Sequence, residues 1–130
     1  MRYSVVGVLC TLVCSSVFAT AAAAACLSDK GSKETATGSL RVEKAHDAMG
    51  HPERPYILHL ASVICLDTQD PGDKVEASKT LHIYSTDPKV MAAIARMVGK
   101  VVTVRGRPFP ALTVHHHAPI VMDVSEIAVR

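Results

Sequence analysis

The stretch Tyr56–Cys65 carries the strongest pattern in the chain, because apolar side chains occupy both of its faces. Successive residues of a strand point to opposite faces, so Leu58 and Leu60 share one face while Ile57 and His59 share the other. Apolar residues on both faces are typical of a strand that is covered on two sides. We therefore expect Tyr56–Cys65 to be a central strand of a small barrel.

Four further stretches have the alternation or the β-branched content that is typical of strands. In the clearest of them, Leu81 and Ile83 point one way while His82 and Tyr84 point the other. The predicted strands besides the central one are Thr35–Lys44, Lys79–Tyr84, Val101–Arg105 and Ile120–Ile127.

One helix is predicted over residues 88–98, between the third and fourth strands. Asp87 can cap its start, Pro88 suits its first turn, and Gly99 marks its end. The order of three strands, one helix and two strands is that of the OB-fold, a small five-stranded barrel. We therefore expect a mainly β, OB-fold-like barrel with one helix between strands three and four.

The segments between these elements are predicted loops. Residues 27–34 have no apolar periodicity, so we expect a loosely tethered start. Ala45–Pro55 and Asp67–Glu76 are rich in residues that favour turns. Gly38 suggests a bulge or bend in the first strand, and Gly106 a close backbone approach at the end of the fourth.

The first 25 of the 130 residues have a different character. A basic start at Arg2 precedes the apolar run Val5–Ala19, and the small residues Ala21–Ala25 follow it. This pattern is typical of a secretory signal peptide, and it is too short for a membrane anchor. We expect residues 1–25 to be that signal and residues 26–130 to be a single OB-like domain, periplasmic or secreted, with no transmembrane segment after cleavage.

Charge and aromatic content argue against a nucleic-acid partner. Removing Arg2 from the 14 Lys and Arg leaves 13 against 12 Asp and Glu, a formal charge of +1. Beyond the signal the aromatic residues are Tyr56, Tyr84 and Phe109. Single-stranded nucleic acids require a basic groove and several stacking rings, so we expect none to bind.

Two cysteines, Cys26 and Cys65, remain beyond the signal. An even pair in a small exported domain favours a disulfide, which would leave Cys65 unavailable as a nucleophile. The alternative is a lipid anchor at Cys26, because the preceding alanines resemble a weak lipoprotein cleavage site.

The three consecutive histidines His115–His117 are the densest chemical cluster. If they begin the last strand, His115 and His117 share a face, where two imidazoles could bind Zn or Cu. A third ligand is then required, and the candidates are His46, His51, His59, His82 and Asp123. The alternatives are structural histidines at the barrel rim and acid–base catalysis.

We expect a non-enzymatic binding or accessory module, because no nucleophile elbow, phosphate loop or paired carboxylates are present. Its surface would be the face of strands two and three, with Tyr56, His59, His82 and Tyr84. Its partner would be an exported protein, a glycan or a small ligand. The alternatives are a metal-binding protein that uses His115 and His117, as a carrier or small hydrolase, and an interaction domain that presents the loop His46–Pro55.

These residues also carry a resemblance to a family. Its features are Cys26-Leu27, Gly38, Leu58-x-Leu60 leading to Ile64-Cys65, and Gly99-Lys100-x-Val102-x-Val104-x-Gly106 followed by Phe109 and the triple histidine. In these features the chain resembles a family of small exported bacterial proteins known only as a domain of unknown function. The resemblance implies an OB-like barrel with a Cys26–Cys65 bridge and no assigned activity. Two prolines in the connection Pro108–Leu112 depart from the pattern and leave the length of strand four open.

Overall fold

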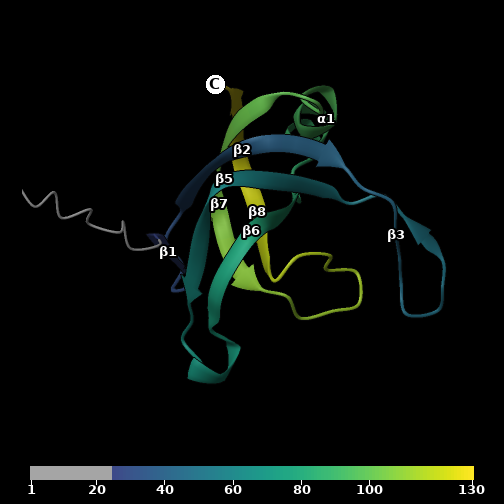
Figure 1. Ribbon diagram of the computed structural model, residues 1–130. Helices are drawn as coiled ribbons and strands as arrows, with labels where there is room; N and C mark the ends of the chain where they lie inside the picture. The colour runs from purple at the N-terminus through teal and green to yellow at the C-terminus, as the bar shows by residue number, and fades with distance from the viewer. Residues whose placement is uncertain (1–24) are drawn as a thin grey trace, which may run out of the picture.

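The computed structural model describes residues 25–130, so the predicted signal peptide lies almost wholly outside the described residues. The described chain is mainly strand (Figure 1). Its elements are β1 (Ala25–Ser28), β2 (Glu34–Val42), β3 (Ala45–His46), β4 (Pro52–Glu53), β5 (Tyr56–Asp67), the 3₁₀ turn η1 (Pro71–Asp73), β6 (Val75–Tyr84), α1 (Pro88–Arg96), β7 (Val101–Pro110) and β8 (Ile120–Val129).

Five long strands close into a barrel. β2 pairs with β5, β5 with β6, β7 with β2 and β7 with β8, all antiparallel. The parallel pairing of β6 with β8 closes the circle. The closed five-stranded barrel with its one helix between β6 and β7 confirms the predicted OB-like fold.

The alternation in the sequence correctly predicts the barrel interior. On β5 and β6 the inward side chains Leu58, Leu81 and Ile83 have no exposed surface. Burial of such side chains is the main favourable contribution to folding. Ile57 is also fully buried although it has the opposite parity, so part of the outer face of β5 is covered as well.

Helix α1 lies beside β8 and packs against the core through Ile94. The Asp87 side chain caps the helix by accepting a hydrogen bond from the amide of Lys89 at 2.8 Å. Ile94 is fully buried, and Gly99 has a φ of +86° just beyond the helix. The start and the buried face of the predicted helix are thereby confirmed, whereas the helix ends at Arg96, two residues before its predicted end.

Gly106 stands where two backbones approach closely. A Cβ at this position would lie 2.2 Å from the carbonyl oxygen of Asp123, and the β7–β8 register shifts beside it. Gly38 has the same role against the His59 carbonyl oxygen, at 2.3 Å. The close approach predicted at Gly106 is confirmed, while Gly38 lies in a regular ladder with β5.

The expectation of a loose segment over residues 27–34 was wrong at its beginning. Strand β1 pairs parallel to the end of β5, and Leu27 is buried. Cys26 lies directly opposite Cys65 in this ladder, and the two form the expected disulfide. The disulfide uses the Cys26 sulfur that a lipid anchor would need. Four residues are too few to show a strand period, so the sequence pattern could not indicate β1.

Two connections leave the barrel on the same side (Figure 1). One is the short hairpin of β3 and β4, and the other is the loop 111–119 between β7 and β8. The expectation that the triple histidine begins a strand was wrong, because His115–His117 lie within this loop and β8 starts at Ile120. Among residues 25–130, no helix is long and apolar enough to cross a membrane.

Candidate functional site

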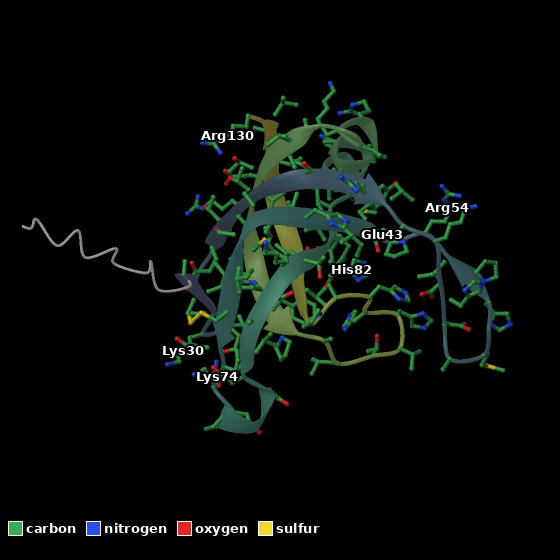
Figure 2. All side chains as sticks on the ribbon, viewed as in Figure 1. Lys30, Glu43, Arg54, Lys74, His82 and Arg130 are labelled. Atoms are coloured by element: carbon green, nitrogen blue, oxygen red, sulfur yellow. A yellow bond between two sulfur atoms is a disulfide. The ribbon has the colours of Figure 1, made fainter. Side chains whose placement is uncertain are left out.

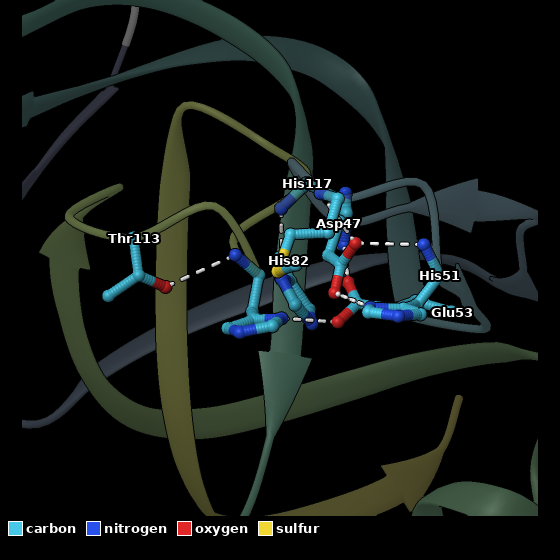
Figure 3. A network of polar contacts seen from close by, with 8 residues as sticks. Asp47, His51, Glu53, His82, Thr113 and His117 are labelled. Carbon is cyan, nitrogen blue, oxygen red and sulfur yellow. Dashed lines mark hydrogen bonds and ion pairs between the residues drawn. The ribbon is translucent and has the colours of Figure 1, made fainter.

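The hairpin β3–β4 and the loop 111–119 meet beside β6, and their polar side chains form one cluster (Figure 3). In an OB-fold these two connections and the face of strands two and three form the usual binding surface. Figure 2 shows His82 on the side of β6 that faces the loop, and Arg54 pointing outward near the base of the hairpin.

Asp47 organises the turn of the hairpin. Its Oδ1 accepts hydrogen bonds from the amides of Met49 at 2.9 Å and His51 at 2.8 Å. Its Oδ2 lies 2.9 Å from Nδ1 of His51. These contacts with His51, side chain first and then backbone, hold the pKa of Asp47 below its usual range. Asp47 is therefore a carboxylate at neutral pH.

His116 organises the opposite loop. Its Nδ1 accepts hydrogen bonds from the amides of Leu112 at 2.9 Å and Thr113 at 3.3 Å. Its pKa is lowered by burial first and then by the neighbouring His115 and His117. A neutral ring with a lone pair on Nδ1 suits this role, so His116 shapes the loop while its two neighbours point elsewhere.

Glu53 on β4 joins the hairpin to the loop. Its Oε1 contacts Nδ1 of His115, and its Oε2 contacts Nε2 of His117. The hydrogen bonds from His117 and then from His115 lower the pKa of Glu53. The structure thus places a carboxylate between the two imidazoles that the sequence suggested as a metal-binding pair.

The two carboxylates of this cluster lack a strong cationic partner. The side chains of Asp47 and Glu53 are 14% and 24% exposed, and their ion-pair partners are histidines. Among residues 25–130, no Lys or Arg forms an ion pair with either of them. Ligand atoms of Asp47, Glu53 and His115 lie within 4.8 Å of one another. The donor set of two carboxylates and one imidazole suits a divalent transition metal.

His82 lies beneath the loop and stays neutral. Its Nδ1 accepts a hydrogen bond from the amide of His117 at 3.2 Å, so its neutral form carries the proton on Nε2. Burial first, and then His117 and His116, lower its pKa to about 4, against a smaller opposing effect of Glu53. While it keeps this bond, His82 offers no lone pair to a metal.

A cleft of about 350 Å³ lies between this cluster and the end of β6. Three of the four residues predicted for the binding surface, Tyr56, His82 and Tyr84, line it together with Met91. The fourth, His59, does not, because its Nε2 lies 2.6 Å from Oε1 of Glu43. His59 lines a separate hollow of about 550 Å³ whose other lining residues, apart from Arg130, are uncharged. The larger hollow therefore offers few titratable side chains for binding or catalysis.

Aromatic packing supports one wall of the cleft. The rings of Tyr84 and Phe109 meet edge to face at 6.3 Å, and Phe109 meets His116 at 5.5 Å. The largest apolar exposures near the cluster are also on the two connections, at Met49 (82%) and Leu112 (67%). The two connections thus expose both polar and apolar groups.

Within residues 25–130, none of the other histidines and acids considered as third ligands forms an ion pair with Glu53. His51 contacts Asp47, Asp123 accepts from the amide of Thr86 at 3.3 Å, and His46 is exposed on β3. Sequence reasoning missed Glu53, which belongs to the predicted loop Ala45–Pro55. The sequence indicates Glu53 only as an acidic residue in a loop that also contains histidines. No spacing relates it to His115, which is 62 residues away.

Fold and site together define an OB-type barrel with a histidine–carboxylate cluster on its two binding-face connections. Residues 80–128 match the model of a family described as Domain of unknown function (DUF4431). The match runs from within β6 to Ala128, one residue before the end of β8, and includes the loop with His115–His117. The resemblance to a domain of unknown function is confirmed over these residues. No curated protein matches the chain.

The low pKa of His82 predicts how the stability of the metal-free protein depends on pH. Because unfolded His82 titrates near 6.5 and folded His82 near 4, the unfolded chain takes up this proton first as the pH falls. Stability from this residue is therefore complete above about pH 6.5 and is lost toward pH 4. Urea unfolding should show a shallower loss in His82→Asn, whose Oδ1 can still accept from His117. Equal losses in both proteins would contradict the assignment.

Proposed function

We propose that the protein is a non-enzymatic, exported binding module of the OB type, and that its ligand binds in the cleft beside β6. The observation that carries this proposal is the convergence of the hairpin, the loop 111–119 and the strand residues Tyr56, His82 and Tyr84 on that one cleft. A concave, partly apolar site with a few polar groups is typical of small-ligand binding.

Export is part of the same proposal. The predicted signal over residues 1–25 supports it, and the Cys26–Cys65 disulfide is of the kind that persists in oxidising compartments. The protein would accordingly act in the periplasm or outside the cell.

The chemistry of the cleft favours an uncharged glycan among the possible ligands. Tyr56 and Tyr84 offer ring surface with a polar tip, and the Glu53 carboxylate can accept hydrogen bonds from hydroxyl groups. Arg54 also lines the cleft, and the nearby carboxylates of Asp47 and Glu53 would weaken its attraction for a polyanion. An exported protein partner would instead contact mainly the exposed side chains of Met49 and Leu112 on the two connections.

NMR titration of the isotope-labelled protein tests this function with two probes, a neutral tetrasaccharide of N-acetylglucosamine and a short oligothymidylate. The tetrasaccharide should shift amide signals around Tyr84 and His82, and Tyr84→Ala should weaken its binding about tenfold or more. His59→Gln, outside the cleft, is the matched control and should bind like the parent protein. Shifts around His59 alone, or shifts produced only by the oligonucleotide, would contradict the proposal.

Metal binding through His115 and His117 is the second candidate function. It is favoured by the contact of both rings with one carboxylate, which supplies a third donor between them. Zn²⁺ and Cu²⁺ both accept such nitrogen and oxygen ligands.

Native mass spectrometry of the tag-free protein before and after chelation tests this second function. A stoichiometric Zn or Cu ion should be present before chelation, and it should be absent from the double variant His115→Ala/His117→Ala. An ion that persists in that variant would place the metal elsewhere on the protein.

A further inference from the structure

Asp47 and Glu53 add two carboxylate ligands to the possible metal site at the histidines. Both carboxylates belong to the hairpin, whereas His115 belongs to the loop that follows β7. Any ion that binds all three would therefore connect two parts of the chain that otherwise meet through imidazole–carboxylate contacts.

We propose that one divalent transition metal ion, Zn²⁺ in the first instance, binds between Asp47, Glu53 and His115 and locks the hairpin to the loop as one wall of the ligand cleft. This inference rests on the second candidate function, keeps its ligands His115 and Glu53, and assigns Asp47 as the third ligand in place of His117. The ion would be a structural clamp of the binding surface, with no chemical step of its own.

The electrostatics of the cluster favour a dication. The two carboxylates are partly shielded from water, and their ion-pair partners are histidines, not Lys or Arg. Two negative charges close together in a partly shielded site repel each other. A dication at this point would neutralise both charges with a single group.

The geometry requires only a small rearrangement. Ligand atoms of the trio already lie within 4.8 Å of one another. A tetrahedral zinc ion with bonds of about 2.0–2.2 Å holds its ligand atoms about 3.4 Å apart, so the direct contact between Glu53 and His115 has to open to admit the ion. The fourth position is open to water or to a donor atom of the ligand in the cleft.

His117 has a different role from His115 in this arrangement. Its Nε2 contacts the second oxygen of Glu53, and its amide donates to Nδ1 of His82. It therefore orients the Glu53 carboxylate, as residues around a metal site commonly orient the ligands themselves. We accordingly expect replacement of His117 to weaken the metal site less than replacement of His115.

The test is calorimetric titration of Zn²⁺ into the chelator-treated, tag-free protein at pH 7.5, with Glu53→Gln, Asp47→Asn and His115→Gln as variants. Asn at position 47 keeps an oxygen for the amides of Met49 and His51, so the hairpin turn is retained. The control is His46→Gln, a histidine of the same hairpin outside the trio. Circular dichroism checks that each variant is folded.

We expect one ion per chain, a loss of affinity of tenfold or more in each trio variant, a smaller loss in His117→Gln and no change in His46→Gln. Zn²⁺ should also slow amide hydrogen exchange over residues 45–53 and 111–117 of the parent protein. If the parent protein binds no Zn²⁺, the second candidate function fails and the inference fails with it. If it binds Zn²⁺ but Glu53→Gln and Asp47→Asn bind equally well, or exchange is unchanged, only the inference is overturned.

Discussion

The carboxylate of Glu53, shared between His115 and His117, is the interaction on which the arrangement of the candidate site depends. It reaches from β4 to the loop between β7 and β8, across 62 and 64 residues of sequence. The barrel brings these connections to one side, but their register against each other rests on this group. Asp47 stabilises the turn of the hairpin and His116 stabilises the loop 111–119, because each accepts hydrogen bonds from backbone amides of its own connection.

This arrangement also explains why the neighbouring histidines behave differently. His82 and His116 each accept backbone hydrogen bonds through Nδ1, which fixes them as neutral supports. His115 and His117 instead contact the Glu53 carboxylate through Nδ1 and Nε2, respectively. Of the three adjacent histidines, His116 thus shapes the loop, His115 pairs with the Glu53 carboxylate, and His117 orients that carboxylate.

The fold could be predicted from the sequence because its determinants are local. Alternation at Leu58, Leu81 and Ile83, the cap at Asp87 and the stop at Gly99 predict strands and a helix without knowledge of the rest of the chain. Their order then indicates the OB arrangement. Strand β1 could not be predicted in this way, because a ladder of four residues opposite β5 and the disulfide position it.

The site could be predicted only in part, because its decisive contacts are not local. Histidines and tyrosines on the binding face were indicated by strand parity, and Tyr56, His82 and Tyr84 do line the cleft. His59 lies outside this cleft and contacts Glu43, which strand parity alone does not show. The triple histidine was assigned to a strand although it lies in a loop, and the partner that matters, Glu53, has no spacing that links it to the histidines.

A double-mutant cycle in the metal-free protein tests most directly whether Glu53 couples the hairpin to the loop. The free energy of unfolding is measured at pH 7 for the parent protein, Glu53→Gln, His117→Gln and the double variant. If the contact holds the two connections together, the double variant loses less stability than the two single losses combined. Strictly additive losses would show that Glu53 and His117 act independently, and this account of the site would then be wrong.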